Sequence, residues 1–267
     1  MKYSVNLSMM FAEYSILDRP RFARDAGCSA VELWWPFDES EPSQTQVDWL
    51  VAALENAGLS LACLNFYAGD MAAGDRGVVS HPSHQRQFQA NVDVATDIAS
   101  RTGCKVLNAL YGNRLEDVPR ESQDEVALEN LAFAARSAEL VGATVVVEPL
   151  NTFENPGYPL VCTVDALRLI DQLAASGYQL GVLYDIYHAQ RMEGNLIATI
   201  REHVAHFAHV QIADSPSRNE PGTGEIAFPR VLAALRDTGY EGYVGLEYIP
   251  TTNSHDSLAW TLSQLEQ

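Results

Sequence analysis

The stretch Val145-Val146-Val147-Glu148-Pro149-Leu150-Asn151 joins three valines to an acidic residue and a proline. Three consecutive valines are typical of a strand buried on both faces, as in a parallel sheet that helices cover. Pro149 cannot donate a hydrogen bond to a neighbouring strand, so we expect the strand to end at Glu148. A carboxylate at the end of a buried strand is costly unless another group pairs with it. The rest of the sequence must supply that partner.

Short apolar runs of this kind recur along the chain, most of them after a glycine that would end a helix. They predict eight strands, at residues 3–8, 30–35, 59–66, 105–110, 143–148, 178–185, 206–212 and 243–248. Segments with apolar residues at helical spacing lie between the runs. This alternation over 267 residues predicts an α/β protein, a (β/α)8 TIM barrel that forms a single domain over residues 1–267. The structural rival is an open doubly wound sheet, whose G-x-G-x-x-G turn is absent after the first run.

Helix starts can be predicted from capping residues. Ser122 followed by Glu125 predicts a capping box that opens the fourth helix. Thr163 with Asp165 predicts the start of the fifth helix, and Ser254 is a candidate cap for the last one.

Long segments follow the third, fifth and seventh predicted strands, at residues 67–82, 152–159 and 214–226. Barrel enzymes build their active sites from loops in these places.

Charge and cysteine content limit the classes of partner. The formal net charge of −18 disfavours nucleic acid or an anionic membrane surface. The four cysteines are scattered with no C-x-x-C pair, which predicts reduced thiols and a cytoplasmic protein. No signal peptide is apparent, and no apolar run approaches the roughly 18 residues of a membrane span. We expect a small-molecule substrate; exposed barrel helices leave a homo-oligomer open, although no stretch specifies one.

Four polar residues occupy equivalent places in the second half of the predicted barrel. Glu148 ends the fifth strand, Asp185 ends the sixth, and Gln211 and Glu247 nearly end the seventh and eighth. Because side chains alternate along a strand, flanking apolar residues that face the helices leave these four pointing inward. Three carboxylates at one inner rim need a counter-charge, which a divalent cation supplies most simply. Oxygen ligands from Glu, Asp and Gln favour Mg²⁺ or Mn²⁺.

Several stretches together resemble a known family, the hydroxypyruvate isomerases of the xylose-isomerase-like barrels. Sugar 3-epimerases and a 2-oxo-tetronate isomerase are close relatives of that family. The resemblance spans nearly the whole chain, and the matching stretches are Asn6-Leu7-Ser8-Met9, Ala68-Gly69-Asp70 with Ala73-Gly74, Glu148-Pro149-Leu150-Asn151, and residues 184–194, 209–214, 220–226 and 245–248. Gln211 agrees with the hydroxypyruvate branch, since the epimerases place histidine there. Met71 stands where the family often has tryptophan.

The resemblance implies an intramolecular oxidoreductase of the aldose–ketose type, in carbohydrate and glyoxylate metabolism. Its reaction would interconvert hydroxypyruvate and 2-hydroxy-3-oxopropanoate (tartronate semialdehyde) through an enediolate. Family members hold a divalent metal with residues matching Glu148, Asp185, Gln211 and Glu247, and residues matching Glu148 and Glu247 transfer the proton. Positions matching His188 and Arg218 contact substrate oxygens, as does one matching Glu154 in the epimerases.

The chemistry of an anionic substrate adds a requirement. Hydroxypyruvate carries a carboxylate, so an acidic protein must offer it a local cation, and Arg218 in the seventh loop and Arg76 in the third are the candidates. A neutral His188, just past the sixth strand, would donate to a substrate oxygen.

Three other functions remain as alternatives. A 2-oxo-tetronate isomerase or a ketose 3-epimerase would use the same glutamates and metal. A metal-dependent endonuclease of damaged DNA on this barrel would need clustered histidines and a basic face, whereas the seven histidines are dispersed and the chain is acidic.

Overall fold

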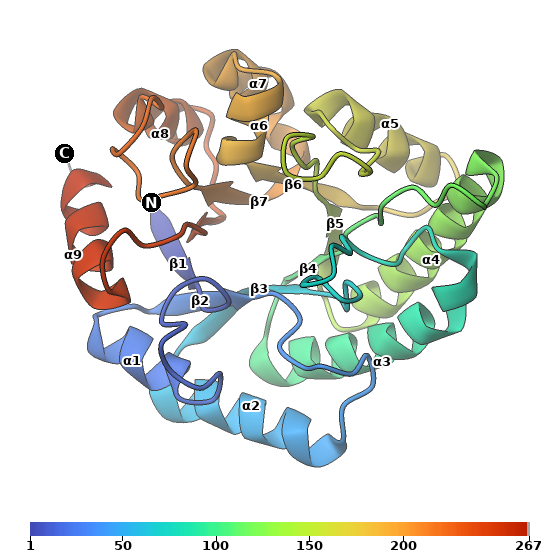
Figure 1. Ribbon diagram of the computed structural model, residues 1–267, viewed down its shortest axis with the longest axis horizontal. Helices are drawn as coiled ribbons and strands as arrows, with labels where there is room; N and C mark the ends of the chain where they lie inside the picture. The colour runs from blue at the N-terminus through green and yellow to red at the C-terminus, as the bar shows by residue number, and fades with distance from the viewer. Residues whose placement is uncertain (266–267) are drawn as a thin grey trace.

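Eight parallel strands form a closed ring surrounded by helices in the computed structural model, which describes residues 1–265 (Figure 1). Each strand pairs with the next in sequence order, and β8 pairs with β1. The strands are β1 (Lys2–Asn6), β2 (Ala30–Leu33), β3 (Ser60–Asn65), β4 (Val106–Asn108), β5 (Thr144–Val147), β6 (Gly181–Asp185), β7 (Phe207–Ile212) and β8 (Tyr243–Leu246). The predicted (β/α)8 barrel and its eight strands are confirmed, and every strand is shorter than the predicted run.

Helices follow the strands on the outside of the ring. They are α1 (Arg19–Asp25), α2 (Gln44–Ala57), α3 (Gln85–Thr102), α4 (Arg120–Leu140), α5 (Thr163–Ala174), α6 (Ile186–Met192), α7 (Leu196–His203), α8 (Phe228–Asp237) and α9 (Ser254–Leu265), with short 3-10 turns η1 (Pro82–His84) and η2 (Val204–His206). No helix within residues 1–265 has the length and apolar character needed to cross a membrane.

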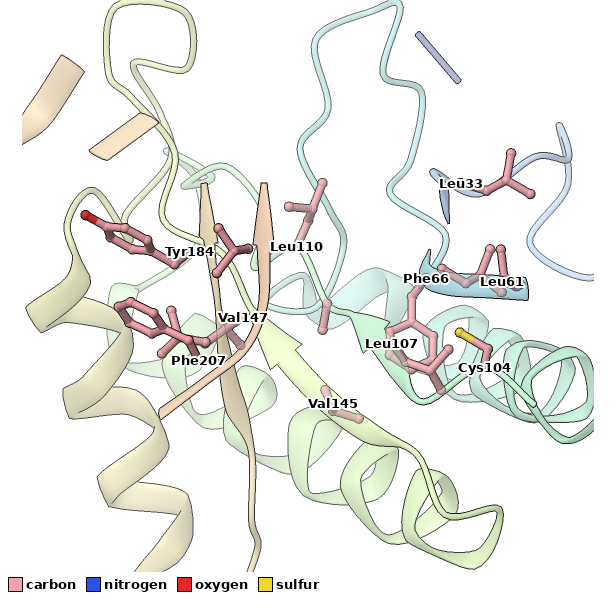
Figure 2. Packing of buried hydrophobic residues seen from close by; sticks show 14 of the residues in the cluster. Leu33, Leu61, Phe66, Cys104, Leu107, Leu110, Val145, Val147, Tyr184 and Phe207 are labelled. Carbon is pink, nitrogen blue, oxygen red and sulfur yellow. The ribbon is translucent and has the colours of Figure 1, made fainter. Parts of the chain in front are cut away.

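Two separate sets of buried side chains distinguish the two faces of the strands. Val145 and Val147 of β5 belong to the large cluster that fills the space between strands and helices (Figure 2). In the same layer Tyr184 and Phe207 stack with ring centroids 4.4 Å apart. A small cluster from four successive strands, Cys63, Val106, Val146 and Leu183, lies on the other face and fills the barrel interior. Val210 and Ile212 of β7 and Val244 and Leu246 of β8 belong to the large cluster too. The alternation predicted for β5, β7 and β8 is therefore confirmed, and Glu148 follows an inward-facing Val146.

The helix starts agree with the capping predictions only in part. The predicted capping box of Ser122 is wrong, because α4 already begins at Arg120 after Pro119. The side chain of Gln123 instead bonds the backbone of the preceding loop, donating to the carbonyl oxygens of Leu115 at 3.0 Å and Val118 at 2.7 Å. These contacts hold the first turn of α4 against the loop, so no Ser122 cap is needed.

The predicted start of α5 at Thr163 with Asp165 is confirmed, whereas the predicted cap of α9 is wrong by one residue. Helix α5 begins at Thr163, and Asp165 accepts from the backbone N–H of Cys162 at 3.3 Å. Helix α9 begins at Ser254, where Asn253 rather than Ser254 accepts the N–H of Asp256, at 3.0 Å.

Candidate active site

A cavity of about 310 Å³ opens at the carboxyl ends of the strands. This volume lies near the lower end of the range for small-molecule sites, about 300–1,000 Å³. All three long loops that follow β3, β5 and β7 contribute to its walls. Its lining includes five of the predicted site residues, Glu148, Glu154, His188, Arg218 and Glu247. The other two, Asp185 and Gln211, are buried beside them.

Glu148 is buried directly after β5 with few donors around it. Its Oε2 accepts a hydrogen bond from Asn108 Nδ2 at 2.8 Å, and its Oε1 lies 4.0 Å from His188 Nε2. Burial raises the pKa of Glu148 well above its usual value, and the neighbouring carboxylates of Glu247 and Asp185 raise it further. Glu148 therefore binds a proton more tightly than an exposed glutamate does.

Glu247 has a richer set of donors after β8. Asn6 Nδ2 at 2.9 Å and Trp34 Nε1 at 2.6 Å both donate to its Oε1, and Arg218 Nη2 donates to its Oε2 at 2.6 Å. Burial raises the pKa of Glu247 to about 7, with Arg218 opposing the shift and Asp185 adding to it. Two buried carboxyl groups with raised pKa values thus face one cavity, as proton transfer at neutral pH requires.

Asp185 and Gln211 each present a buried oxygen that accepts no hydrogen bond from the described residues. Asp185 Oδ1 caps α6 by accepting from the backbone N–H of Tyr187 at 2.7 Å, while its Oδ2 accepts no hydrogen bond from the described residues. Gln211 donates through Nε2 to Glu32 at 2.7 Å, and its Oε1 is likewise without a donor among residues 1–265. Buried acceptors without donors are rare in proteins and point to a bound cation or water.

The imidazole of His188 has a defined orientation. The backbone N–H of Asn151 donates to Nδ1 at 3.0 Å, so Nδ1 must carry a lone pair. Burial and the cations Arg218, Arg191 and Arg76 hold the pKa of His188 well below its usual value, which keeps the ring neutral. The hydrogen of a neutral ring then lies on Nε2, which is 3.6 Å from Asp185 Oδ2. A neutral ring with its hydrogen on Nε2 is what the predicted role of His188 as a donor requires, and that role stays a prediction.

These residues fit a divalent cation. Glu148, Asp185 and His188 bring ligand atoms within 4.8 Å of one another. Because His188 Nε2 carries the hydrogen, the free oxygen of Gln211 is a better third ligand, which leaves an all-oxygen set suited to Mg²⁺ or Mn²⁺. Glu247, the fourth predicted ligand, lies outside that group, with its oxygens bonded to Asn6, Trp34 and Arg218. Its role as a ligand stays a prediction.

Arg218 is held by the loop that follows β7. Its Nη2 lies 3.7 Å from Asp185 Oδ2, and its guanidinium lies 5.3 Å from the ring centroid of Tyr187. Asp214 organises the loop by accepting four backbone N–H bonds, from Ser215, Gly222, Gly224 and Ile226. Arg218 itself has a φ of 57°. A left-handed non-glycine backbone at a site residue indicates a conformation that its surroundings impose.

Glu154 joins the site through the loop that follows β5. It accepts hydrogen bonds from the hydroxyl of Tyr187 and from Asn151 Nδ2, the latter at 3.1 Å. The structure therefore gathers all seven predicted residues at one end of the barrel.

Four residues of this network were missed in the sequence: Asn6, Glu32, Trp34 and Asn108. Glu32 is the most informative of them, because it lies between Val31 and Leu33 in β2 and is 1% exposed. Strand alternation would have placed it inward by the argument used for Glu247. Its carboxylate accepts from Ser4, Asn6, His209 and Gln211.

The sequence of this chain is similar to that of known proteins over nearly its whole length. Residues 20–264 match the sequence model of the xylose isomerase-like TIM barrels. The chain belongs to this family. A putative hydroxypyruvate isomerase of Streptomyces coelicolor is 46% identical, over 97% of this chain and 95% of its own length. The hydroxypyruvate isomerase of Escherichia coli is 36% identical, over 97% and 98%. A 2-oxo-tetronate isomerase of Cupriavidus necator is 34% identical, over 97% and 96%.

A solved structure of this family is similar over nearly its whole length. It is described as an AP endonuclease of family 2 from Brucella melitensis, with 36% identity, a TM-score of 0.88 and 98% of each chain covered. The expected family resemblance is confirmed, and so is the prediction of an isomerase-type enzyme, since the curated relatives above are named isomerases.

Proposed function

We propose that this member of the family interconverts hydroxypyruvate and 2-hydroxy-3-oxopropanoate. The observation that carries the proposal is that Glu148 and Glu247 line one cavity and that both have raised pKa values. The names of the relatives with 46% and 36% identity over nearly the full chain support the choice of substrate.

The reaction moves one carbon-bound proton and one hydroxyl proton. One glutamate takes the proton from C3 of hydroxypyruvate, which gives an enediolate, and a glutamate returns a proton to C2. The hydrogen on O3 passes to O2, so that the carbonyl and the hydroxyl exchange places. His188 Nε2–H would donate to the oxygen that becomes negative.

We also propose that Glu148, Asp185 and Gln211 hold a Mg²⁺ or Mn²⁺ ion, with Glu247 as the fourth expected ligand. When bound, such a cation stabilises developing negative charge on oxygen as a Lewis acid. The buried oxygens of Asp185 and Gln211 that accept no hydrogen bond from the described residues support this part of the proposal. Arg218 supplies a second positive charge, next to Glu247 and Asp185.

A 2-oxo-tetronate isomerase is the second candidate, because a relative with 34% identity carries that name and the substrate adds only one hydroxymethyl group. A ketose 3-epimerase has less support, since Gln211 stands where the epimerases have histidine. DNA cleavage is disfavoured by the net charge of −18. Within residues 1–265, the candidate metal group contains one histidine rather than a histidine cluster.

We further propose that the protein acts in the cytoplasm, because its four cysteines are free thiols.

A substrate panel with and without chelator tests this function. We expect hydroxypyruvate to give a higher kcat/KM than 2-oxo-tetronate or free ketoses. Chelator should abolish turnover, and added Mn²⁺ or Mg²⁺ should restore it. A higher kcat/KM for a ketose would overturn the substrate assignment. Full activity after metal removal would overturn the metal while leaving both glutamates in the mechanism.

A further inference from the structure

Two arginines line the cavity, and their surroundings differ. Arg218 Nη2 lies 2.6 Å from Glu247 Oε2 and 3.7 Å from Asp185 Oδ2, so carboxylates already compensate its charge. Arg76, in the loop between β3 and η1, contacts only neutral acceptors. Its Nε donates to Asn155 Oδ1 at 2.6 Å, and its Nη1 donates to the backbone oxygens of Met71 at 3.1 Å and Asp75 at 2.6 Å.

The charge of Arg76 is therefore uncompensated. No carboxylate within residues 1–265 forms an ion pair with it, although its own neighbour Asp75 is acidic; Asp75 instead accepts the backbone N–H of Asp70 at 2.8 Å. Its Nη2 donates to no described residue. Arg76 is thus a half-buried cation at the cavity wall with a free donor, in a protein whose net charge is −18.

Hydrogen bonds hold both the backbone of Arg76 and the side chain of Asn155 that accepts from its guanidinium. The backbone oxygen of Arg76 accepts the N–H of Gly112 at 3.0 Å. Asn155, which receives the Arg76 side chain, is itself anchored because its N–H and its Nδ2 both donate to the backbone oxygen of Asn151, each at 3.1 Å. A guanidinium fixed in this way loses little side-chain freedom when it binds a ligand.

We propose that Arg76 binds the carboxylate of the substrate, with Asn155 as its positioning residue, and so selects 2-oxo acids over neutral ketoses. Guanidinium and carboxylate form strong, charge-assisted hydrogen bonds, and a free Nη2 is the donor such a contact needs. Arg218 is then left to act on the reacting oxygens beside Glu247. This inference rests on the proposed function, because a neutral substrate has no carboxylate to bind.

Steady-state kinetics of R76M and R76K on hydroxypyruvate test the proposal. Loss of a hydrogen bond to a charged group should raise KM by about 10- to 100-fold in R76M, with kcat within about twofold of wild type. R76K keeps the charge and should show a smaller rise. The inhibition constant of glycerate, an anionic probe that cannot isomerise, should rise in R76M by the same factor as KM.

The control is R191M, which removes a positive charge that lowers the pKa of His188, as Arg76 does, but that does not line the cavity. Arg191 donates to the backbone oxygen of Pro216 at 2.8 Å and lies over the ring of Phe153. The KM of R191M for hydroxypyruvate and its inhibition constant for glycerate should stay within about twofold of the wild-type values. Equal effects of R191M and R76M would mean that these arginines attract the anionic substrate only through their long-range electrostatic field. That result would overturn the inference.

A fall in kcat with unchanged KM in R76M would also overturn it, by showing that Arg76 only supports the fold of the loops. Failure of the proposed function would be seen separately, in the wild-type enzyme, as a higher kcat/KM for a neutral ketose than for hydroxypyruvate. Melting temperatures of all three variants near that of the wild type would confirm that the kinetic effects are local.

Discussion

Gln211 donates its side-chain N–H to Glu32 at 2.7 Å, and this contact determines which atom of the amide remains free. The amide nitrogen is engaged, so the oxygen Oε1 is the buried atom without a partner among the described residues. Glu32 can only accept as a carboxylate, and burial alone would raise its pKa. Its neighbour His209 and its hydrogen bonds overcome that effect and hold the pKa of Glu32 below its usual value. A charged Glu32 thus orients the Gln211 amide with its oxygen free, as the proposed role of Gln211 as a metal ligand requires.

Replacing Glu32 tests this relationship. In E32Q the new amide can donate to Gln211 as well as accept from it, so the orientation of Gln211 is no longer fixed. We expect the affinity for Mn²⁺ to fall by about 10- to 100-fold, as for other groups that orient metal ligands. Calorimetric titration of the metal measures this directly.

The matched control for E32Q is S4A. Ser4 donates to Glu32 Oε2 at 2.9 Å and does not contact Gln211, so its loss removes one hydrogen bond of Glu32 without freeing the amide. The affinity of S4A for Mn²⁺ should stay near that of the wild type. Wild-type affinity in E32Q would show that Gln211 does not depend on Glu32.

The raised pKa of Glu247 predicts a pH dependence of stability in the metal-free protein. Burial raises that pKa from 4.5 to about 7, so the folded state binds the proton more tightly than the unfolded state. The resulting stability is complete below pH 4.5 and is lost as the pH rises through about 7. The free energy of unfolding, measured in excess chelator from pH 5 to 8, should fall more steeply for the wild type than for E247Q. One proton accounts for at most about 1.4 kcal/mol per pH unit. Equal slopes in the two proteins would contradict the shift.

Gly77 and Gly74 form a matched pair in the loop that carries Arg76. Both have a positive φ, 100° and 110°, but a Cβ at Gly77 would overlap the backbone oxygen of Leu110, whereas one at Gly74 has nothing within 4 Å. Both alanine variants carry the backbone strain of about 1–3 kcal/mol. Only G77A adds displacement of the loop, so its melting temperature should fall further and its KM for hydroxypyruvate should rise. Similar melting temperatures and KM values would show that the loop adapts without moving Arg76.

The barrel, and the polar residues at the ends of β5, β6, β7 and β8, could be predicted from the sequence. Three valines precede Glu148, and Val244 and Leu246 flank Gly245 before Glu247. With every second apolar residue placed against the helices, strand ends and inward directions could be predicted from period two. The same logic applies to Glu32, but that residue stands in the middle of a four-residue strand without a loop motif to draw attention to it.

Other contacts depend on distances that only the fold provides. Asn6 and Glu247 are 241 positions apart and meet because β1 closes the barrel against β8. The difference between Arg76 and Arg218 has the same origin. Both are loop arginines in the sequence, and only the folded chain shows that carboxylates surround one and neutral oxygens surround the other.

The turnover of hydroxypyruvate by E148Q and E247Q tests the central claim most directly. Each substitution keeps the shape of the side chain and removes its capacity to take up a proton. If the two glutamates share proton transfer, kcat should fall by about 10²- to 10⁴-fold in each variant, with the circular dichroism spectrum unchanged. Retention of near-wild-type kcat by either folded variant would contradict the mechanism.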